Sequence, residues 1–168
     1  AAAVENHLNM VRAVVSQPAV PSAAVAALLN SAVGYFKAAT PLSRMGQSVA
    51  LSSDGSTLAV GAHADDSLVA GSGAVYVFTR SPTGWTQQAL LKAATPATGS
   101  RFGVSVALSS DGQRLAVGAS GHDHFRGAIY IFERSNGNWA QQWFQPDPLP
   151  RTMIGSWREF GWSIALSG

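Results

Sequence analysis

The sequence predicts an all-β protein in which one four-stranded antiparallel sheet is encoded twice in succession, and three observations support this. The stretch FGVSVALSSDGQRLAVGA at 102–119 recurs upstream as MGQSVALSSDGSTLAVGA at 45–62. Its opening is found a third time as FGWSIALSG at 160–168. Within each copy apolar and small residues alternate, and Gly-containing polar turns separate the apolar runs. Such internal similarity is typical of repeat architectures.

The repeat extends beyond this stretch with one change of spacing. Asp54 matches Asp111 at an offset of 57 (111 − 54), whereas Tyr76 matches Tyr130 at an offset of 54 (130 − 76). Three residues are therefore missing from the second unit, between Ala119 and Gly127. Length variation confined to one segment predicts a loop there.

Each unit reads as two hairpins. In the second unit, the turn at 110–112 lies between the segments GVSVALS and RLAVGA. A second turn, at Asn136-Gly137, lies between GAIYIFERS and NWAQQW. The fourth strand is more polar, as expected at a sheet edge. Four antiparallel strands in about 55 residues, repeated in tandem, form the blade of a β-propeller. We therefore expect tandem four-stranded antiparallel blades of a partial β-propeller.

Four parts of the chain are expected. Residues 1–34 read as a linker or packing segment, with a helix after Ser22. Residues 35–98 form one blade with a preceding strand, residues 99–158 a second blade, and residues 159–168 the first strand of a third, truncated blade. Since a propeller needs at least about four blades, we expect a piece of a longer protein or a subunit that a partner completes.

Composition argues against several functions. Only 12% of the residues are charged, the formal charge is +2, and no basic run is present, so nucleic acid is not an expected partner. The absence of cysteine excludes disulfides and thiolate chemistry. No apolar run approaches the ~20 residues of a membrane-spanning helix.

The ordered motifs in the second unit, FGVSVALSSDGQRLAVGA followed by GAIYIFERSNGNWAQQ, resemble the bacterial FG-GAP repeat, a blade unit related to the β-propeller of integrin α subunits. The resemblance covers about residues 35–168. The first copy departs at Met45, where a thioether fills a similar apolar hole. The resemblance implies a non-catalytic scaffold for a protein or glycan ligand in an exported protein, at the cell surface, outside the cell or in the periplasm.

Many blades of this family carry a calcium loop between their first two strands. Here the matching turns, SSDGST at 52–57 and SSDGQR at 109–114, keep one carboxylate each, Asp54 and Asp111. Calcium takes six to eight oxygen ligands, several of them anionic. We therefore expect plain hairpin turns, no metal and no cofactor.

By the same resemblance, the loops at 62–73, 119–127 and 93–101 lie on the face that such propellers use for ligands. The candidate residues there are Asp65, Asp66, His122, Asp123, His124 and Arg126. The His-x-His pair would hold a transition metal only if a third ligand converged, and we interpret these side chains as solvated loop residues. For Trp85 and Trp139 we favour packing between blades over stacking on sugars.

No catalytic residues are expected, because no G-x-S-x-G elbow occurs and the glycine cluster at 71–73 precedes a strand. Three alternatives stay open. The chain could be a structural fragment that self-assembles or completes a propeller with other blades. It could belong to a propeller-housed hydrolase or lyase. A cytosolic WD-repeat-like sensor would explain the Ser-x-Asp-Gly turns, but the GA-I/V-Y-I/V-F and WxQQ segments argue against it.

Overall fold

The computed structural model describes residues 38, 40–149 and 158–167. The helix or linker expected within residues 1–34 lies outside this range. Chain contacts define two units, Ala1–Tyr35 and Phe36–Gly168, and both sheets belong to the second. Within the described residues, no helix has the length and apolar character needed to cross a bilayer.

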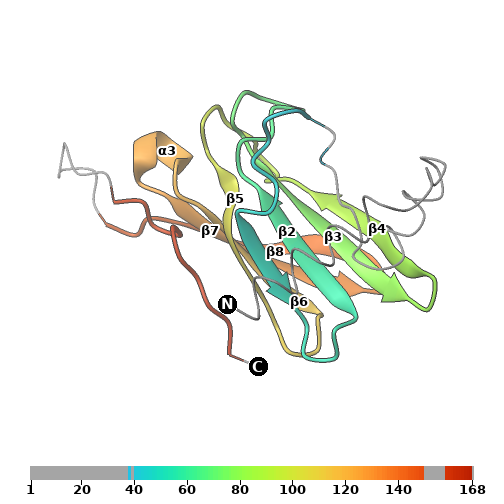
Figure 1. The fold of residues 1–168 in the computed structure, drawn as a ribbon. Helices are drawn as coiled ribbons and strands as arrows, with labels where there is room; N and C mark the ends of the chain where they lie inside the picture. Colours follow the sequence, from blue (N-terminus) through green and yellow to red (C-terminus); the bar gives the residue numbers. More distant parts are fainter. Residues whose placement is uncertain (1–37, 39, 150–157, 168) are drawn as a thin grey trace, which may run out of the picture. The chain divides into compact units, whose positions relative to one another are not determined.

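Two four-stranded antiparallel sheets make up the described fold (Figure 1). The first sheet contains β1 (Ser48–Leu51), β2 (Thr57–Ala62), β3 (Ala74–Ser81) and β4 (Gly84–Leu91). The second sheet contains β5 (Phe102–Leu108), β6 (Arg114–Ala119), β7 (Ala128–Ser135) and β8 (Asn138–Pro146). Neighbours in each sheet are neighbours in sequence. The prediction of tandem blades of a partial β-propeller is confirmed.

The first hairpin of each sheet turns at the predicted Ser-Asp-Gly sequence. Gly55 and Gly112 occupy the left-handed region in the two Ser-Asp-Gly turns, with φ of 68° and 66°. Both sheets also carry a β-bulge at the same place in their fourth strand, where Gln88 in β4 and Gln142 in β8 have no partner on the third strand. The bulges were not predicted, because a bulge of this kind needs no residue that stands out in the alternating pattern.

The hydrophobic core lies between the two sheets. Strands β1 and β2 contact β5, and one face of the first sheet packs on one face of the second. The fully or nearly buried residues of this core include Val75, Val77, Leu91, Phe102, Val106, Leu115, Val117, Tyr130 and Phe132. The ring of Phe102 meets Tyr130 and Phe132 edge to face, with centroids 5.1 and 5.9 Å apart. The outer strand β8 is largely exposed and β4 is partly exposed, in agreement with the prediction that the fourth strand lies at an edge.

Glycines allow each repeat to approach the next. A Cβ on Gly61 would lie 2.0 Å from the carbonyl oxygen of Gly103, and a Cβ on Gly118 would lie 1.8 Å from that of Gly161. Those same two carbonyls accept hydrogen bonds from Ser48 (2.8 Å) and from its counterpart in the second sheet (2.7 Å). The third FG pair therefore docks on the second sheet as the second FG pair docks on the first.

Of the two equivalent tryptophans, Trp139 packs between the two sheets as expected, whereas Trp85 packs on the other face of the first sheet. Trp139 lies against the core between the sheets, and its indole N–H donates to Gln88 Oε1 across the seam at 3.0 Å. Trp85 packs against the apolar cluster on the other face of the first sheet, which contains Tyr76 and Phe78. Both indoles therefore contribute to packing in the described structure.

Candidate functional site

The second sheet has a hollow at each end. Strand β6 begins at Arg114 beside the Ser-Asp-Gly turn and ends at Ala119 before the β6–β7 loop, so hollows at the turn and at the loop lie at opposite ends of the sheet. We call them the turn-end hollow, of 730 Å³, and the loop-end hollow, of 650 Å³.

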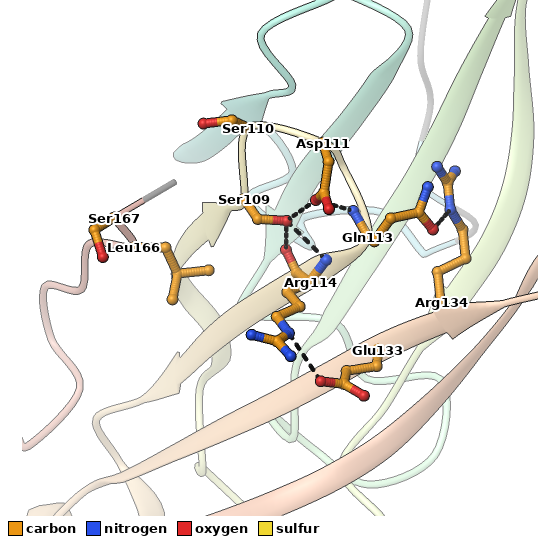
Figure 2. A pocket seen from close by; sticks show the side chains of 9 residues that line it. All are labelled: Ser109, Ser110, Asp111, Gln113, Arg114, Glu133, Arg134, Leu166 and Ser167. Atoms are coloured by element: carbon orange, nitrogen blue, oxygen red, sulfur yellow. Dashed lines mark hydrogen bonds and ion pairs between the residues drawn. The ribbon is translucent and has the colours of Figure 1, made fainter.

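At the turn-end hollow, the carboxylate of Asp111 folds back onto its own turn (Figure 2). It accepts hydrogen bonds from the Ser109 hydroxyl at 2.6 Å and from the Gln113 amide at 2.9 Å. Asp54 repeats this pattern in the first sheet, and the hydrogen bonds from Ser52 and Ser56 lower the pKa of Asp54 to about 2. These carboxylates act as turn residues.

The long polar side chains of the turn-end hollow are also paired with each other. Arg114 Nε donates to Glu133 at 2.9 Å, and Arg134 Nε donates to Gln113 at 3.1 Å (Figure 2). In the described part of the chain, no group of three or more His, Asp or Glu side chains is arranged to hold a metal ion. The expectation that calcium is not bound here stays a prediction.

The loop-end hollow brings together two of the loops predicted to face a ligand. Its lining comes from the inter-sheet loop at 97–100, from the β6–β7 loop at 121–126, and from Phe144, Pro146 and Asp147 at the end of β8. Four of the six candidate residues therefore share one hollow, namely His122, Asp123, His124 and Arg126. Asp65 and Asp66 do not line it.

The β6–β7 loop contains a short turn, α3 (His122–Phe125), with unusual backbone geometry. Asp123, His124 and Phe125 have positive φ angles of 47°, 60° and 66°. Left-handed backbone costs roughly 1–2 kcal/mol per non-glycine residue. Strain of this size is common at functional sites, and this loop has three such residues in succession.

The two histidines of the loop have different environments. Nδ1 of His122 is buried without a hydrogen-bond partner, and the ring meets Phe144 edge to face at 5.4 Å. Burial lowers the pKa of His122 although Asp123 opposes the shift, so the imidazole is neutral at pH 7. The side chain of His124 is 96% exposed and lies 3.5 Å from Asp123. Of these two histidines, His122 is therefore the one with a buried polar atom that lacks a partner among the described residues.

Arg126, near the C-terminal end of the β6–β7 loop, ties the loop to the residues that follow β8. Its guanidinium contacts Asp123 at 3.2 Å and Asp147 at 3.5 Å, and it donates to the backbone carbonyl of Leu149. Arg158 contacts Asp147 at 2.9 Å. Burial would raise the pKa of Asp147, but its hydrogen bonds and these two cations hold that pKa below its usual range. The charged residues of the hollow thus form ion pairs with each other that hold the loop against the end of β8.

Asp65 occupies the place in the first sheet that His122 occupies in the second (122 − 65 = 57), but it has no exposed surface. Its carboxylate pairs with Lys92 and accepts hydrogen bonds from Thr40 at 2.8 Å, Ser67 at 2.6 Å and Tyr76 at 3.3 Å. Burial would raise the pKa of Asp65, but these donors outweigh it and keep that pKa well below its usual range. Asp65 therefore holds its loop in place.

Asp66 also bonds within its own loop. Its carboxylate accepts a hydrogen bond from the Gly71 amide at 2.6 Å. A ligand-binding role for either aspartate stays a prediction.

The FG-GAP repeat model matches residues 43–78 and 85–132, which together are half of the chain. The chain belongs to the FG-GAP repeat family. The second FG-GAP match begins at Trp85 in β4 and ends at Phe132 in β7, so it joins the last strand of one sheet to the first three of the next. A search among curated proteins finds no match.

Sequence reasoning on this FG-GAP chain missed Phe144 and Asp147. Phe144 is 38% exposed on the polar strand β8. An apolar residue among glutamines could have indicated a contact at the strand end. Asp147 carried no signal, because the arginines that pair with it are distant in sequence and meet it only in the fold.

Proposed function

We propose that this FG-GAP segment is a non-catalytic interaction scaffold of an exported or cell-surface protein, and that a protein or glycan ligand binds at the loop-end hollow. The proposal starts from the fold, since blades of this type form propeller-like interaction domains. It locates the ligand where two loops meet the end of strand β8, and loops held on a rigid sheet are the usual place for variable recognition surfaces.

One observation carries the choice of hollow. At the turn end Arg114 is paired with Glu133 and Arg134 with Gln113, whereas at the loop end Nδ1 of His122 is buried beside the ring of Phe144 and has no partner among the described residues. A buried polar atom without a partner costs about 1–3 kcal/mol. A ligand that turns the His122 ring far enough to hydrogen-bond this atom, and that places an apolar group on Phe144, would recover that cost.

The non-catalytic assignment rests on the same residues. Thr98 and Ser100 line the hollow, but within the described residues neither hydroxyl is hydrogen-bonded to His122. A hydrolase that uses a serine or threonine nucleophile needs such a bond to an adjacent base.

The test is a ligand screen followed by variants. The chain is applied to a glycan array and to a displayed random-peptide library, and binders are measured by calorimetry. We expect a saturable ligand whose affinity falls about tenfold in His122→Ala, which corresponds to about 1.4 kcal/mol. The exposed His124→Ala serves as the control and should bind normally. The absence of any saturable ligand, or equal binding by both variants, would contradict the proposal.

A second candidate role is assembly with further blades or other copies of the chain. Val49 and Leu51 in β1 are 61% and 56% exposed, whereas the equivalent Val106 in β5 is 9% exposed because the first sheet covers it. A preceding blade would cover β1 in the same way. Light scattering over a range of concentrations should then give a mass above that of the monomer, and a monomer at every concentration would contradict this role.

A further inference from the structure

We propose that a third hollow, of 290 Å³, is a subsite for an acidic sugar, with the sugar carboxylate bound by Arg44 and Arg101. Its lining includes Arg44, Gln47, His63, Arg101 and Trp162. These residues come from the starts of three successive repeats and from the end of β2. The proposal extends the glycan part of the proposed function to a separate place on the surface.

The cationic character of this hollow comes from one repeat position. Arg44 and Arg101 are equivalent residues (101 − 44 = 57), each directly before the first residue of its MG or FG pair. Both have left-handed backbone, with φ of 54° and 57°. No carboxylate lines the hollow. Two guanidinium groups around one small space create a site for an oxyanion.

Both arginines keep hydrogen-bond donors for a ligand. Within the described part of the chain, Arg44 has no ion-pair or hydrogen-bond partner for its guanidinium. The guanidinium of Arg101 lies 4.8 Å from the centroid of the Phe125 ring, which orients it, and its one ion pair, with Glu159, is at 4.0 Å. Since a guanidinium carries five N–H donors, one long contact leaves most of them available.

His63 provides an independent sign of a missing partner. It is 7% exposed, it lines the hollow, and its Nδ1 has no hydrogen-bond partner among the described residues. Burial lowers the pKa of His63, and the charges of Arg44 and Arg101 lower it further. The imidazole is therefore neutral at pH 7 and can hydrogen-bond a sugar hydroxyl.

Trp162 and the size of the hollow favour a sugar ring. Trp162 belongs to the third repeat start, lines the hollow and is 51% exposed. An exposed indole beside a polar hollow offers an apolar face on which a pyranose ring can stack. The volume lies just below the roughly 300–1,000 Å³ of pockets for drug-sized ligands, so the space suits one small unit. A planar carboxylate matches the guanidinium fork in a bidentate way.

The test uses NMR titration of the intact chain with glucuronate, glucose and inorganic phosphate. We expect saturable amide shifts with glucuronate at residues 44–47, 63–64 and 99–104, and at least tenfold weaker binding of glucose. Arg44→Gln and Arg101→Gln should each weaken glucuronate binding at least tenfold. Arg114→Gln removes an equal charge at the turn-end hollow and should leave the affinity unchanged. Circular dichroism checks the fold of each variant.

Trp162→Ala separates a sugar subsite from a general anion site. It should weaken glucuronate binding and leave phosphate binding unchanged. Phosphate that binds more tightly than glucuronate, with no effect of Trp162→Ala, would overturn the proposal, as would equal binding of glucose or unaffected arginine variants. His122→Ala should not alter glucuronate binding, so failure at this hollow can be told apart from failure at the loop-end hollow.

Discussion

At the scale of the residue, the contact between successive repeats depends on positions that have no room for a side chain. Gly61 faces the backbone of Gly103, and Gly118 faces that of Gly161 in the same way. The neighbour in each case is a peptide carbonyl, which cannot rotate away as a flexible side chain would. The sheets themselves would have to separate to admit a methyl group.

Gly61→Ala should therefore destabilise the protein by about 3 kcal/mol, through overpacking of a close backbone contact. Gly55→Ala is the matched control, because nothing lies within 4 Å of its added Cβ although its φ is 68°. It should cost only about 1 kcal/mol of backbone strain. Urea unfolding measures both free energies, and equal effects would contradict the proposed close approach.

Asp65 shows how a buried carboxylate links stability to pH. Because the pKa of Asp65 is lowered in the folded state, its contribution is fully present above the unfolded value of about 3.9 and is lost as pH falls towards the folded value. Asp65→Asn should cost about 3 kcal/mol at pH 7 by leaving Lys92 without its anion.

The pH dependence of unfolding checks this assignment. The stability difference between the natural chain and Asp65→Asn should be constant above about pH 5 and narrow below about pH 4. The exposed Asp66→Asn is the control and should change stability by less than about 0.5 kcal/mol. A difference that does not depend on pH would show that Asp65 contributes without its charge.

At the scale of the element, the equivalent strands β1 and β5 differ in exposure because the first sheet covers only β5. Strand β5 is enclosed by β1 and β2, whereas Val49 in β1 is 61% exposed. Val106→Ala should therefore lower the free energy of unfolding by about 2 kcal/mol. Val49→Ala should change it by no more than about 0.5 kcal/mol. Urea unfolding of both variants tests this, and a large effect at Val49 would mean that β1 is covered in solution.

The strands and their hairpin turns could be predicted because their signals are local. Ser-Asp-Gly and Asn-Gly fix the turns, and alternation fixes the faces of strands such as β7. The left-handed turn at 123–125 could not be predicted, since none of its residues is a glycine and the Phe125 carbonyl accepts hydrogen bonds from the distant amides of Arg158 and Glu159. The same limit applies to Asp65, whose partners Thr40 and Lys92 lie 25 and 27 residues away.

The sequence indicated which loops would lie together, but not how their side chains are arranged. Four of the six candidate residues line one hollow, which the position of the loops in a propeller blade indicated. The pair Arg44 and Arg101 was missed because an arginine before an apolar residue and a glycine is not unusual in either repeat alone. Only the packing of the first sheet on the second brings the two residues to one hollow.

At the scale of the whole described fold, each repeat start completes the sheet before it. Parallel bridges join Gly73 to Phe102 and Gly127 to Phe160. The amides of Phe102 and Phe160 donate to the carbonyls of Ser72 and Arg126 at 3.0 and 2.9 Å. The same contact thus occurs twice, which is the property that allows blades to be added in series.

The measurement that tests this account most directly is a set of nuclear Overhauser effects between the repeats. We predict cross-peaks from Gly103 Hα to the Val75 methyl groups, because a Cβ on Gly103 would lie 3.1 Å from Val75 Cγ2. We also predict cross-peaks from Gly118 Hα to Gly161 Hα, since a Cβ on Gly161 would lie 3.2 Å from Gly118 Cα. Their absence, with backbone cross-peaks between β4 and β5 instead, would show one continuous sheet and contradict face-to-face packing of two blades.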